Sequence, residues 1–231
     1  MRKAWHLSIA AALVGLLSFV NPAPLRAADD DTKETDRVRN AGKVAKEIMD
    51  IPDDIPQDLI NKADCVIVLP SVLKAAFIVG ASYGRGVMTC RTGDSFRGPW
   101  SAPSMMALEG GSFGFQIGGQ VTEFIIILNT RAAVTAFARG GNVELGGALS
   151  VVAGPLGRVA EAGVLPLAAV YTYSRSQGFF AGASLEGTIF IAQSGKNAKY
   201  YQQPVTPEEI LSGRAVPPPG ARALIAALDQ Y

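Results

Sequence analysis

Apolar residues recur at every third or fourth position near the start of the sequence, which is the spacing of an amphipathic helix. The pattern covers residues 32–50, and basic residues occupy many of the polar positions between. Its apolar positions are Val38, Ala41, Ala45, Ile48 and Met49. The following IPDDIP ends the helix, because proline interrupts helical hydrogen bonding, and QDLINKA adds a further short helical segment.

A different pattern begins at Cys65, where short runs of β-branched and aromatic residues are separated by glycine. The runs are CVIVLP, AAFIVGASYGRGVMTCR, GSFGFQIGGQVTEFIIILN, NVELGGALSVVAG and AAVYTYSRSQGFFAGASLEGTIFI. They follow one another too closely for helical crossovers, which favours antiparallel strands over a parallel α/β sheet. Glycines also fall inside the runs, as at Gly84, Gly86 and Gly118, where they indicate bending, a bulge or the close approach of another backbone.

Further helices are predicted after these first strands. TRAAVTAFAR is a helix between strands, and PPGARALIAAL is a last short helix. In TPEEILSG, Thr206 is the N-cap, Pro207 the first helical residue, and Glu209 completes a capping box. The whole pattern predicts an α+β fold: a strongly bent, glycine-rich antiparallel β-sheet or partial barrel with N-terminal and C-terminal helices.

The first 27 residues have the three-part pattern of a secretory signal peptide. Arg2 and Lys3 precede the apolar run HLSIAAALVGLLSFV, and PLRA offers a small residue for cleavage after Ala27. An uncleaved membrane anchor is the alternative, although the run is short for a bilayer span. We expect an exported chain, periplasmic or secreted and peripheral on a membrane, with residues 28–36 as a flexible leader and 37–231 as a single domain.

The charge balance argues against nucleic-acid binding. The 231 residues include 21 basic and 20 acidic residues and a single histidine, His6. Cleavage after Ala27 removes three basic residues and no acidic one, which leaves 18 basic and 20 acidic residues. Because a nucleic-acid-binding domain is usually clearly basic, we expect no nucleic-acid partner. The same cleavage removes His6, so the mature chain has no imidazole.

The motif GGSFG has the G-x-S-x-G spacing that presents a nucleophilic serine, here Ser112, in hydrolases. Such a serine needs a base, commonly histidine, and the mature chain has none. No S-x-x-K spacing joins Ser112 to a lysine, and FQIGGQVTEFIIIL has the pattern of a strand where the motif requires a helix. The acidic residues are scattered without a metal-binding pattern. We therefore expect no enzyme, no cofactor and no metal site.

The two remaining chemical features are a pair of cysteines and two groups of basic residues. A disulfide between Cys65 and Cys90 would close a loop of about two dozen residues and stabilise the fold by roughly 3 kcal/mol in the chain-entropy model. Two buried thiols are the alternative, because spacing alone does not show whether the Cα atoms approach each other.

The basic residues are candidates for binding anionic lipid headgroups, since arginine and lysine bind phosphate. The first group lies on the N-terminal helix, and the second surrounds the first β run beside a tryptophan. They are Lys33, Arg37, Arg39, Lys43 and Lys46, and then Lys74, Arg85, Arg91 and Trp100. Ordinary strand-edge charge is the alternative for the second group. The apolar stripe of the helix either packs on the β core or lies on an anionic membrane.

Several blocks between Cys65 and Ile191 resemble the SYLF domain family. They are ADCVIVLPSVLKAAFIVGASYGRGVMTCR, GPWSAPSMMALEGGSFGFQIGGQVTEFIIILN, VVAGPLGR and YSRSQGFFAGASLEG, in this order. The resemblance implies binding of phosphoinositide-containing or other anionic membranes without catalysis, with residues 32–49 as the counterpart of a membrane-contacting N-terminal helix. Eukaryotic members carry SH3 or FYVE modules and some associate with actin, whereas this sequence begins with an export signal. We expect a lipid-binding module of the bacterial envelope; the alternative is an envelope structural or protein-interaction domain with a protein partner.

Overall fold

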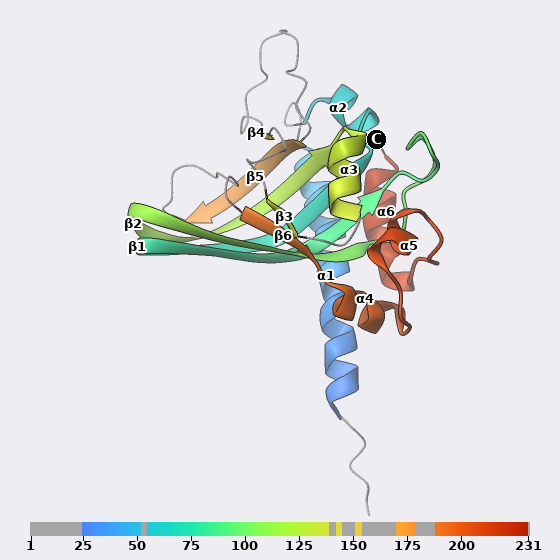
Figure 1. Ribbon diagram of the computed structural model, residues 1–231, viewed down its shortest axis with the longest axis horizontal. Helices are drawn as coiled ribbons and strands as arrows, with labels where there is room; N and C mark the ends of the chain where they lie inside the picture. Colours follow the sequence, from blue (N-terminus) through green and yellow to red (C-terminus); the bar gives the residue numbers. More distant parts are fainter. Residues whose placement is uncertain are drawn as a thin grey trace, which may run out of the picture.

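The computed structural model describes residues 25–51, 55–138, 142–144, 151–153, 170–178 and 188–230, and within these ranges it describes the side chains of all residues except 25–32, 76–79, 112–117, 151–153 and 176–178. A strongly curled sheet lies at its centre, with helices against both faces (Figure 1). The elements are α1 (Leu25–Met49), α2 (Gln57–Asn61), β1 (Cys65–Cys90), β2 (Ser104–Leu128), α3 (Arg131–Ala138), β3 (Asn142–Glu144), β4 (Val151–Ala153), β5 (Val170–Gly178), β6 (Thr188–Ala192), α4 (Ser194–Tyr201), α5 (Pro207–Leu211), the 3-10 helix η1 (Pro219–Ala221) and α6 (Arg222–Leu228).

Strands β1 and β2 form one long antiparallel ribbon that extends away from the helices, to the left in Figure 1. Phe77 pairs with Ile117 and Val79 pairs with Phe113, so β2 has three residues between these pairs where β1 has one. An unequal number of residues on paired strands bends the ribbon, with the longer path on the outside. The ribbon therefore doubles back, with β1 on the inside of the bend.

The two halves of β1 consequently lie against each other. Its first and last residues, Cys65 and Cys90, are joined by a disulfide, with a Cα–Cα distance of 3.9 Å. Beside them, the backbone N–H of Arg91 donates to the carbonyl of Asp64 at 2.8 Å. The structure thus confirms the disulfide, one of the two alternatives that the sequence left open.

The other strands extend the ribbon on the free edge of β2. Residues Gln120–Leu128 of β2 pair with β5, and residues Met106–Gly110 pair with β6, which in turn pairs with β3. All these pairs are antiparallel, whereas the short β4 pairs with β5 in parallel. The predicted α+β fold with a strongly bent, mainly antiparallel sheet is confirmed.

Alternating residues of the strands divide between two apolar clusters. Val66, Val68, Ile125 and Ile127 face the side covered by α1 and α6. Their neighbours Ile67, Leu69, Phe124 and Ile126 face the opposite side, where Phe137 of α3 lies edge to face on Phe190 of β6. Helices thus cover part of both faces of the sheet. We call the face with Val66 and Ile125 the α1 face and the face with Ile67 and Ile126 the α3 face.

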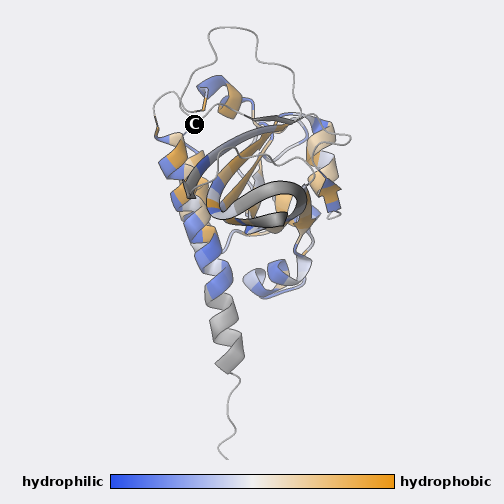
Figure 2. Ribbon diagram, turned by 90° about the vertical axis from the view of Figure 1, so that its left-hand side faces the viewer, coloured by the Kyte–Doolittle hydropathy of each residue, from blue (hydrophilic) through white to orange (hydrophobic). Residues whose placement is uncertain are grey.

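Helix α1 buries the apolar stripe that the sequence predicted. Val38, Ala41 and Ala45 are completely buried in the cluster on the α1 face, and Ile48 is 1% exposed. Hydrophilic and hydrophobic residues alternate along this helix, which runs up the left side of Figure 2. Of the two destinations considered for the stripe, the β core is the one observed.

The start of α1 differs from the expected boundaries. The helix begins at Leu25 and runs through residues 28–36, which the sequence predicted to be a flexible leader. Glu34 is completely buried and ion-paired, so this end of the predicted leader is part of the folded domain. Residues 1–24 of the predicted signal peptide lie outside the described residues. Across the segments that the structure describes, no helix is both long enough and apolar enough to cross a bilayer.

Two further sequence predictions concern local structure. Thr206 and Glu209 form the predicted capping box: the Thr206 Oγ1 accepts from the Glu209 backbone N–H at 3.2 Å, and the Glu209 carboxylate accepts from the Thr206 N–H at 2.8 Å. Strand β2 continues through Ser112 without a turn. The GGSFG motif is therefore no strand-to-helix elbow.

Candidate functional site

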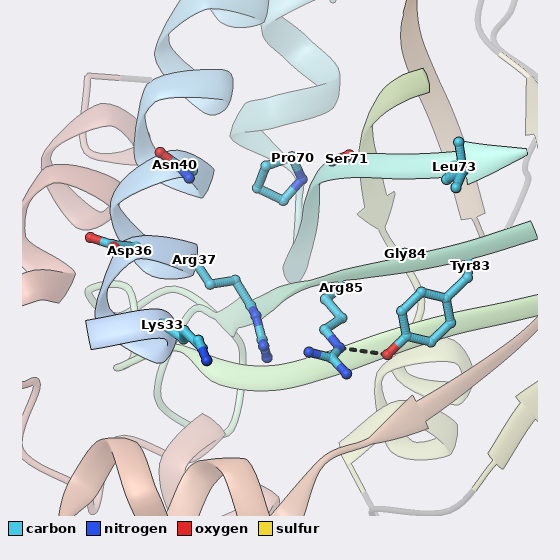
Figure 3. A pocket seen from close by; sticks show the side chains of 10 residues that line it. All are labelled: Lys33, Asp36, Arg37, Asn40, Pro70, Ser71, Leu73, Tyr83, Gly84 and Arg85. Carbon is cyan, nitrogen blue, oxygen red and sulfur yellow. Dashed lines mark hydrogen bonds between the residues drawn. The ribbon is translucent and has the colours of Figure 1, made fainter. Parts of the chain in front are cut away.

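A cleft of about 570 Å³ opens on the α1 face, between the N-terminal half of α1 and the two halves of β1. Figure 3 shows its lining from both elements. The lining residues are Lys33, Asp36, Arg37, Asn40, Pro70, Ser71, Leu73, Tyr83, Gly84 and Arg85. The cleft thus joins basic residues from the two groups that the sequence had placed about 50 positions apart.

Arg37 is the most tightly held cation of the cleft. Its side chain is only 8% exposed, and its guanidinium contacts the carboxylate of Glu34 at 2.8 Å and the amide oxygen of Gln193 at 3.2 Å. Burial lowers the pKa of Arg37, the charge of Glu34 opposes this shift, and the nearby charge of Arg85 adds to it. Because a guanidinium does not lose its proton in proteins, Arg37 remains a fixed positive charge.

The buried Glu34 carboxylate fixes Arg37 in place. Its second oxygen lies 2.9 Å from the Nζ of Lys196 in α4, so a single buried anion joins two cations and ties α1 to α4. A buried carboxylate is tolerated only when it is paired, which explains why both cations converge on it. Two cations from different elements thus converge on one buried carboxylate next to the cleft.

Arg85 supplies the second fixed cation, from the opposite wall. The alternation of a strand places Tyr83 and Arg85 on one face of β1, where the Arg85 Nε donates to the Tyr83 hydroxyl. The guanidinium carbon also lies 5.4 Å from the centroid of the Tyr83 ring. Among the described residues, no carboxylate lies within ion-pair distance of Arg85. Its charge is therefore available to an anion in the cleft.

Gly84 brings this wall close to the other half of β1. A Cβ atom at Gly84 would lie 2.5 Å from the Val72 side chain and 3.2 Å from the Ser71 carbonyl. A larger residue would push the Tyr83–Arg85 wall away from the Pro70–Ser71 wall. The glycine thus sets the width of the cleft.

The remaining charges of the cleft are Lys33 and Asp36. Lys33 is exposed at the rim, and Asp36, the one acidic residue of the lining, forms an exposed ion pair with Arg39. The cleft lining therefore contains three basic side chains and one carboxylate, and this carboxylate is paired with Arg39. Arginine and lysine in such an arrangement bind phosphate and other oxyanions.

The structure assembles only some of the predicted basic residues. Lys33, Arg37 and Arg85 line the cleft, whereas Lys43 and Lys46 form ion pairs with Glu47 and Asp50 farther along α1 at 3.6 and 2.6 Å. Arg39 does not line the cleft, although its partner Asp36 does, and Lys74 is half-buried on β1 and does not line the cleft either.

Arg91 and Trp100 lie elsewhere in the molecule. They form an isolated bridge beside the disulfide, where the Arg91 guanidinium carbon lies 4.5 Å from the centroid of the Trp100 ring. Trp100 is 4% exposed and belongs to the core. The structure therefore does not bring this pair to the cleft.

The sequence reasoning missed Tyr83 and Glu34. Tyr83 and Arg85 are separated by two positions within a predicted strand, so the period of a strand already placed them on one face. Glu34 had a weaker signal, because its spacing of three from Arg37 indicates a helical ion pair but does not show its burial. Within the described residues, no cluster of acidic, histidine or cysteine side chains is suited to hold a metal ion.

The structure thus combines a strongly curled sheet, helices on both of its faces and a basic cleft on the α1 face. A family model described as "Las17-binding protein actin regulator" matches residues 109–231. The chain belongs to this family, the Ysc84 or SYLF domain family, as its sequence blocks predicted.

Similar proteins support this assignment. LAS seventeen-binding protein 3 of Saccharomyces cerevisiae is 38% identical over 213 residues, which cover 90% of this chain and 45% of that protein. The SH3 domain-containing YSC84-like protein 1 is 43% identical in Homo sapiens over 84% of this chain and 58% of that protein. In Xenopus laevis it is 44% identical over 84% of this chain and 59% of that protein. The chain therefore spans about half the length of these relatives, of which the yeast protein is named for binding LAS seventeen. No solved structure shows significant similarity.

Proposed function

We propose that this chain is a non-enzymatic module that binds anionic phospholipid, with the phosphate of the headgroup held in the cleft between α1 and β1. The main observation in support is that Lys33, Arg37 and Arg85 line one cleft, and that the single acidic residue of its lining, Asp36, is already paired with Arg39. Arg37 is pre-oriented by Glu34, so little side-chain freedom is lost when an anion binds. A phosphoinositide or another phosphate-bearing lipid fits this charge pattern.

We also propose that the chain works outside the cytoplasm, in the bacterial envelope or beyond. The signal-peptide pattern of the first 27 residues supports export. The Cys65–Cys90 disulfide supports it independently, because disulfides persist mainly in oxidising compartments. The module would then be periplasmic or secreted and peripheral on the membrane.

A protein partner is the second candidate function. It is supported by the description of the family and by the name of the yeast relative, both of which refer to Las17 binding. The same cleft would then receive an acidic side chain of the partner.

Vesicle co-sedimentation of the full chain tests lipid binding. Binding should increase when phosphatidylglycerol or a phosphoinositide is added to phosphatidylcholine vesicles, and salt should weaken this increase because it screens charge. Each basic residue near an anionic membrane contributes about 1 kcal/mol, so the double variant Lys33→Gln/Arg85→Gln should bind anionic vesicles about 30-fold more weakly.

The matched control removes the same amount of charge from α1 outside the cleft. The double variant Lys43→Gln/Lys46→Gln should bind nearly as well as the wild type, because neither lysine lines the cleft and each is ion-paired with an acidic residue four positions farther along the chain. Competition with free glycerol phosphate separates a membrane ligand from a small phosphate. Equal binding to neutral and anionic vesicles would refute the proposal.

A further inference from the structure

Part of the α1 face of the sheet is left uncovered beyond α1. Leu73 pairs with Val121 across the ribbon, and Glu109 lies between Tyr83 and Ile189 on neighbouring strands. The exposed fractions of the four apolar side chains are 53% for Leu73, 43% for Val121, 42% for Tyr83 and 37% for Ile189. Exposed apolar side chains thus lie along both halves of the bent ribbon, and Ile189 of β6 adds to them beside Glu109.

The described positions next to these residues on each half of the ribbon carry small residues. Ala75 pairs with Gly119 and Ala81 pairs with Gly111, and all four are exposed on the same face. A Cβ atom at Gly111 or Gly119 would meet no atom within 4 Å. No described side chain of the protein covers this area. We call it, together with Leu73, Val121, Tyr83 and Ile189, the ribbon face.

The ribbon face is continuous with the basic cleft. Leu73 and Tyr83 belong to both, since they line the cleft together with Lys33, Arg37 and Arg85. Three carboxylates of the described strands lie on this face. Glu123 is paired with Arg175 at 2.6 Å, whereas Glu109 lies between Tyr83 and Ile189, and the exposed Glu144 pairs with Ile189 at the β3 edge of the apolar area.

We infer that the ribbon face is the surface that enters the apolar layer of the membrane, while the cleft holds the headgroup. This inference rests on the proposed function of the cleft. An anionic bilayer offers phosphate at its surface and acyl chains directly beneath, and the protein offers cations beside exposed apolar residues. Such adjacency is typical of surfaces that bind membranes by combined apolar and electrostatic contacts.

The charges favour a lipid layer over a second copy of this chain. Two copies that met through the ribbon face would bring the arginines and lysines of two clefts toward each other. Like charges at an interface are unfavourable. Helix α1 is also unavailable as the inserting element, because its apolar stripe is buried against the sheet.

Tryptophan fluorescence tests which residues reach the acyl chains. The full chain carries Trp5→Phe, which leaves the buried Trp100 as an internal reference. One variant adds Val121→Trp on the ribbon face, and the matched control adds Val216→Trp, at a position 82% exposed in the C-terminal part. The probe is a vesicle of phosphatidylcholine and phosphatidylglycerol with brominated acyl chains, which quench tryptophan on contact.

The inference predicts quenching and a blue shift for Val121→Trp and neither for Val216→Trp. If Val121→Trp binds the anionic vesicles but is not quenched, the inference is wrong while the proposed function stands. Quenching of both variants would likewise contradict a specific ribbon face. If the chain forms a concentration-dependent dimer in the absence of vesicles, and this dimer buries the tryptophan of Val121→Trp, the ribbon face binds a second copy of the chain and the inference is wrong. If the chain does not bind anionic vesicles at all, the proposed function fails and the inference with it.

A second pair of variants separates apolar from electrostatic contributions. Leu73→Ser/Val121→Ser should weaken vesicle binding about tenfold with an unchanged salt dependence, because it removes apolar contact and no charge. Arg85→Gln should instead reduce the salt dependence of vesicle binding, because it removes a positive charge. The urea midpoint of each variant checks that the fold is intact. Wild-type binding by Leu73→Ser/Val121→Ser would overturn the inference.

Discussion

Gly86 lies where the backbones of the two halves of β1 are in close contact, so its replacement by alanine should disturb the fold that builds the cleft. A Cβ atom at this position would lie 2.0 Å from the carbonyl oxygen of Val68 and 2.9 Å from the Cα of Leu69. Both are backbone atoms, which cannot rotate away as a side chain does. The two halves would have to separate by more than 1 Å to reach an ordinary contact distance.

The disulfide makes such a separation costly. Cys65 and Cys90 hold the ends of the same two halves at a Cα distance of 3.9 Å, only a few residues from Gly86. Overpacking of a close contact typically costs about 1–3 kcal/mol and occasionally more. Because the clash is with backbone and the neighbouring chain is tied, we expect Gly86→Ala to lower the free energy of unfolding by about 3 kcal/mol or more.

Urea denaturation followed by circular dichroism measures this change, and Gly111→Ala is the matched control. Gly111 lies in a strand of the same ribbon, but a Cβ there meets open space. Alanine is also favoured over glycine in a strand interior by roughly 0.5–1 kcal/mol, so this variant should be as stable as the wild type or slightly more stable. Equal stability of Gly86→Ala and Gly111→Ala would refute the close approach of the two halves of β1.

Three other predictions concern what holds the domain together. Cys90→Ser should lower the free energy of unfolding by roughly 3 kcal/mol, measured by urea denaturation, because the disulfide closes a loop with a sequence separation of 25. Asn197→Ala should lower the free energy of unfolding by about 1–3 kcal/mol in the same assay. The side-chain oxygen of the buried Asn197 accepts from the Met105 N–H at 2.7 Å, and the variant leaves this N–H buried without a partner. The pKa of Glu47 is lowered by its hydrogen bond with Arg175, and that of Glu209 by hydrogen bonds from Thr206. A carboxylate whose pKa is lowered by folding stabilises the folded state at pH values above its ordinary pKa of 4.5. This stabilisation is lost as the pH falls from 4.5 through the lowered pKa. The variant Glu47→Gln/Glu209→Gln should therefore show a smaller loss of stability at acid pH than the wild type, measured as the free energy of unfolding against pH.

The fold could be predicted from the sequence because its patterns are local. The period of α1, the alternation of the strands and the glycines within them all reflect burial of one face of an element. The capping box at Thr206 was predicted for the same reason, since its contacts span three residues. The alternation of apolar and polar residues does not show which segments far apart in the sequence are in contact. The doubling back of β1, and with it the pairing of Cys65 with Cys90, depends on the unequal residue count at the bend.

The cleft was predicted only in part for a related reason. The helical period places all five basic residues of α1 at polar positions and does not distinguish between them. In the structure, however, Arg37 is buried beside Glu34, whereas Lys43 and Lys46 pair with the acidic residues Glu47 and Asp50. This difference arises from the packing of α4 against α1, which brings Lys196 to Glu34. No periodicity within α1 predicts a partner 162 positions away in the chain.

The burial of α1 also decides how the resemblance to the SYLF family applies to this chain. The resemblance implied a membrane-contacting N-terminal helix, but Val38, Val44, Ile48 and Met49 are all at least nine-tenths buried within the domain. Burying an apolar side chain of this size contributes about 1.5–3 kcal/mol, so releasing four of them would cost about 6–12 kcal/mol. That is comparable with the total stability of a typical domain. Helix α1 can therefore contribute charge to a membrane site through Lys33 and Arg37, while the apolar contact has to come from residues that are already exposed on the ribbon face.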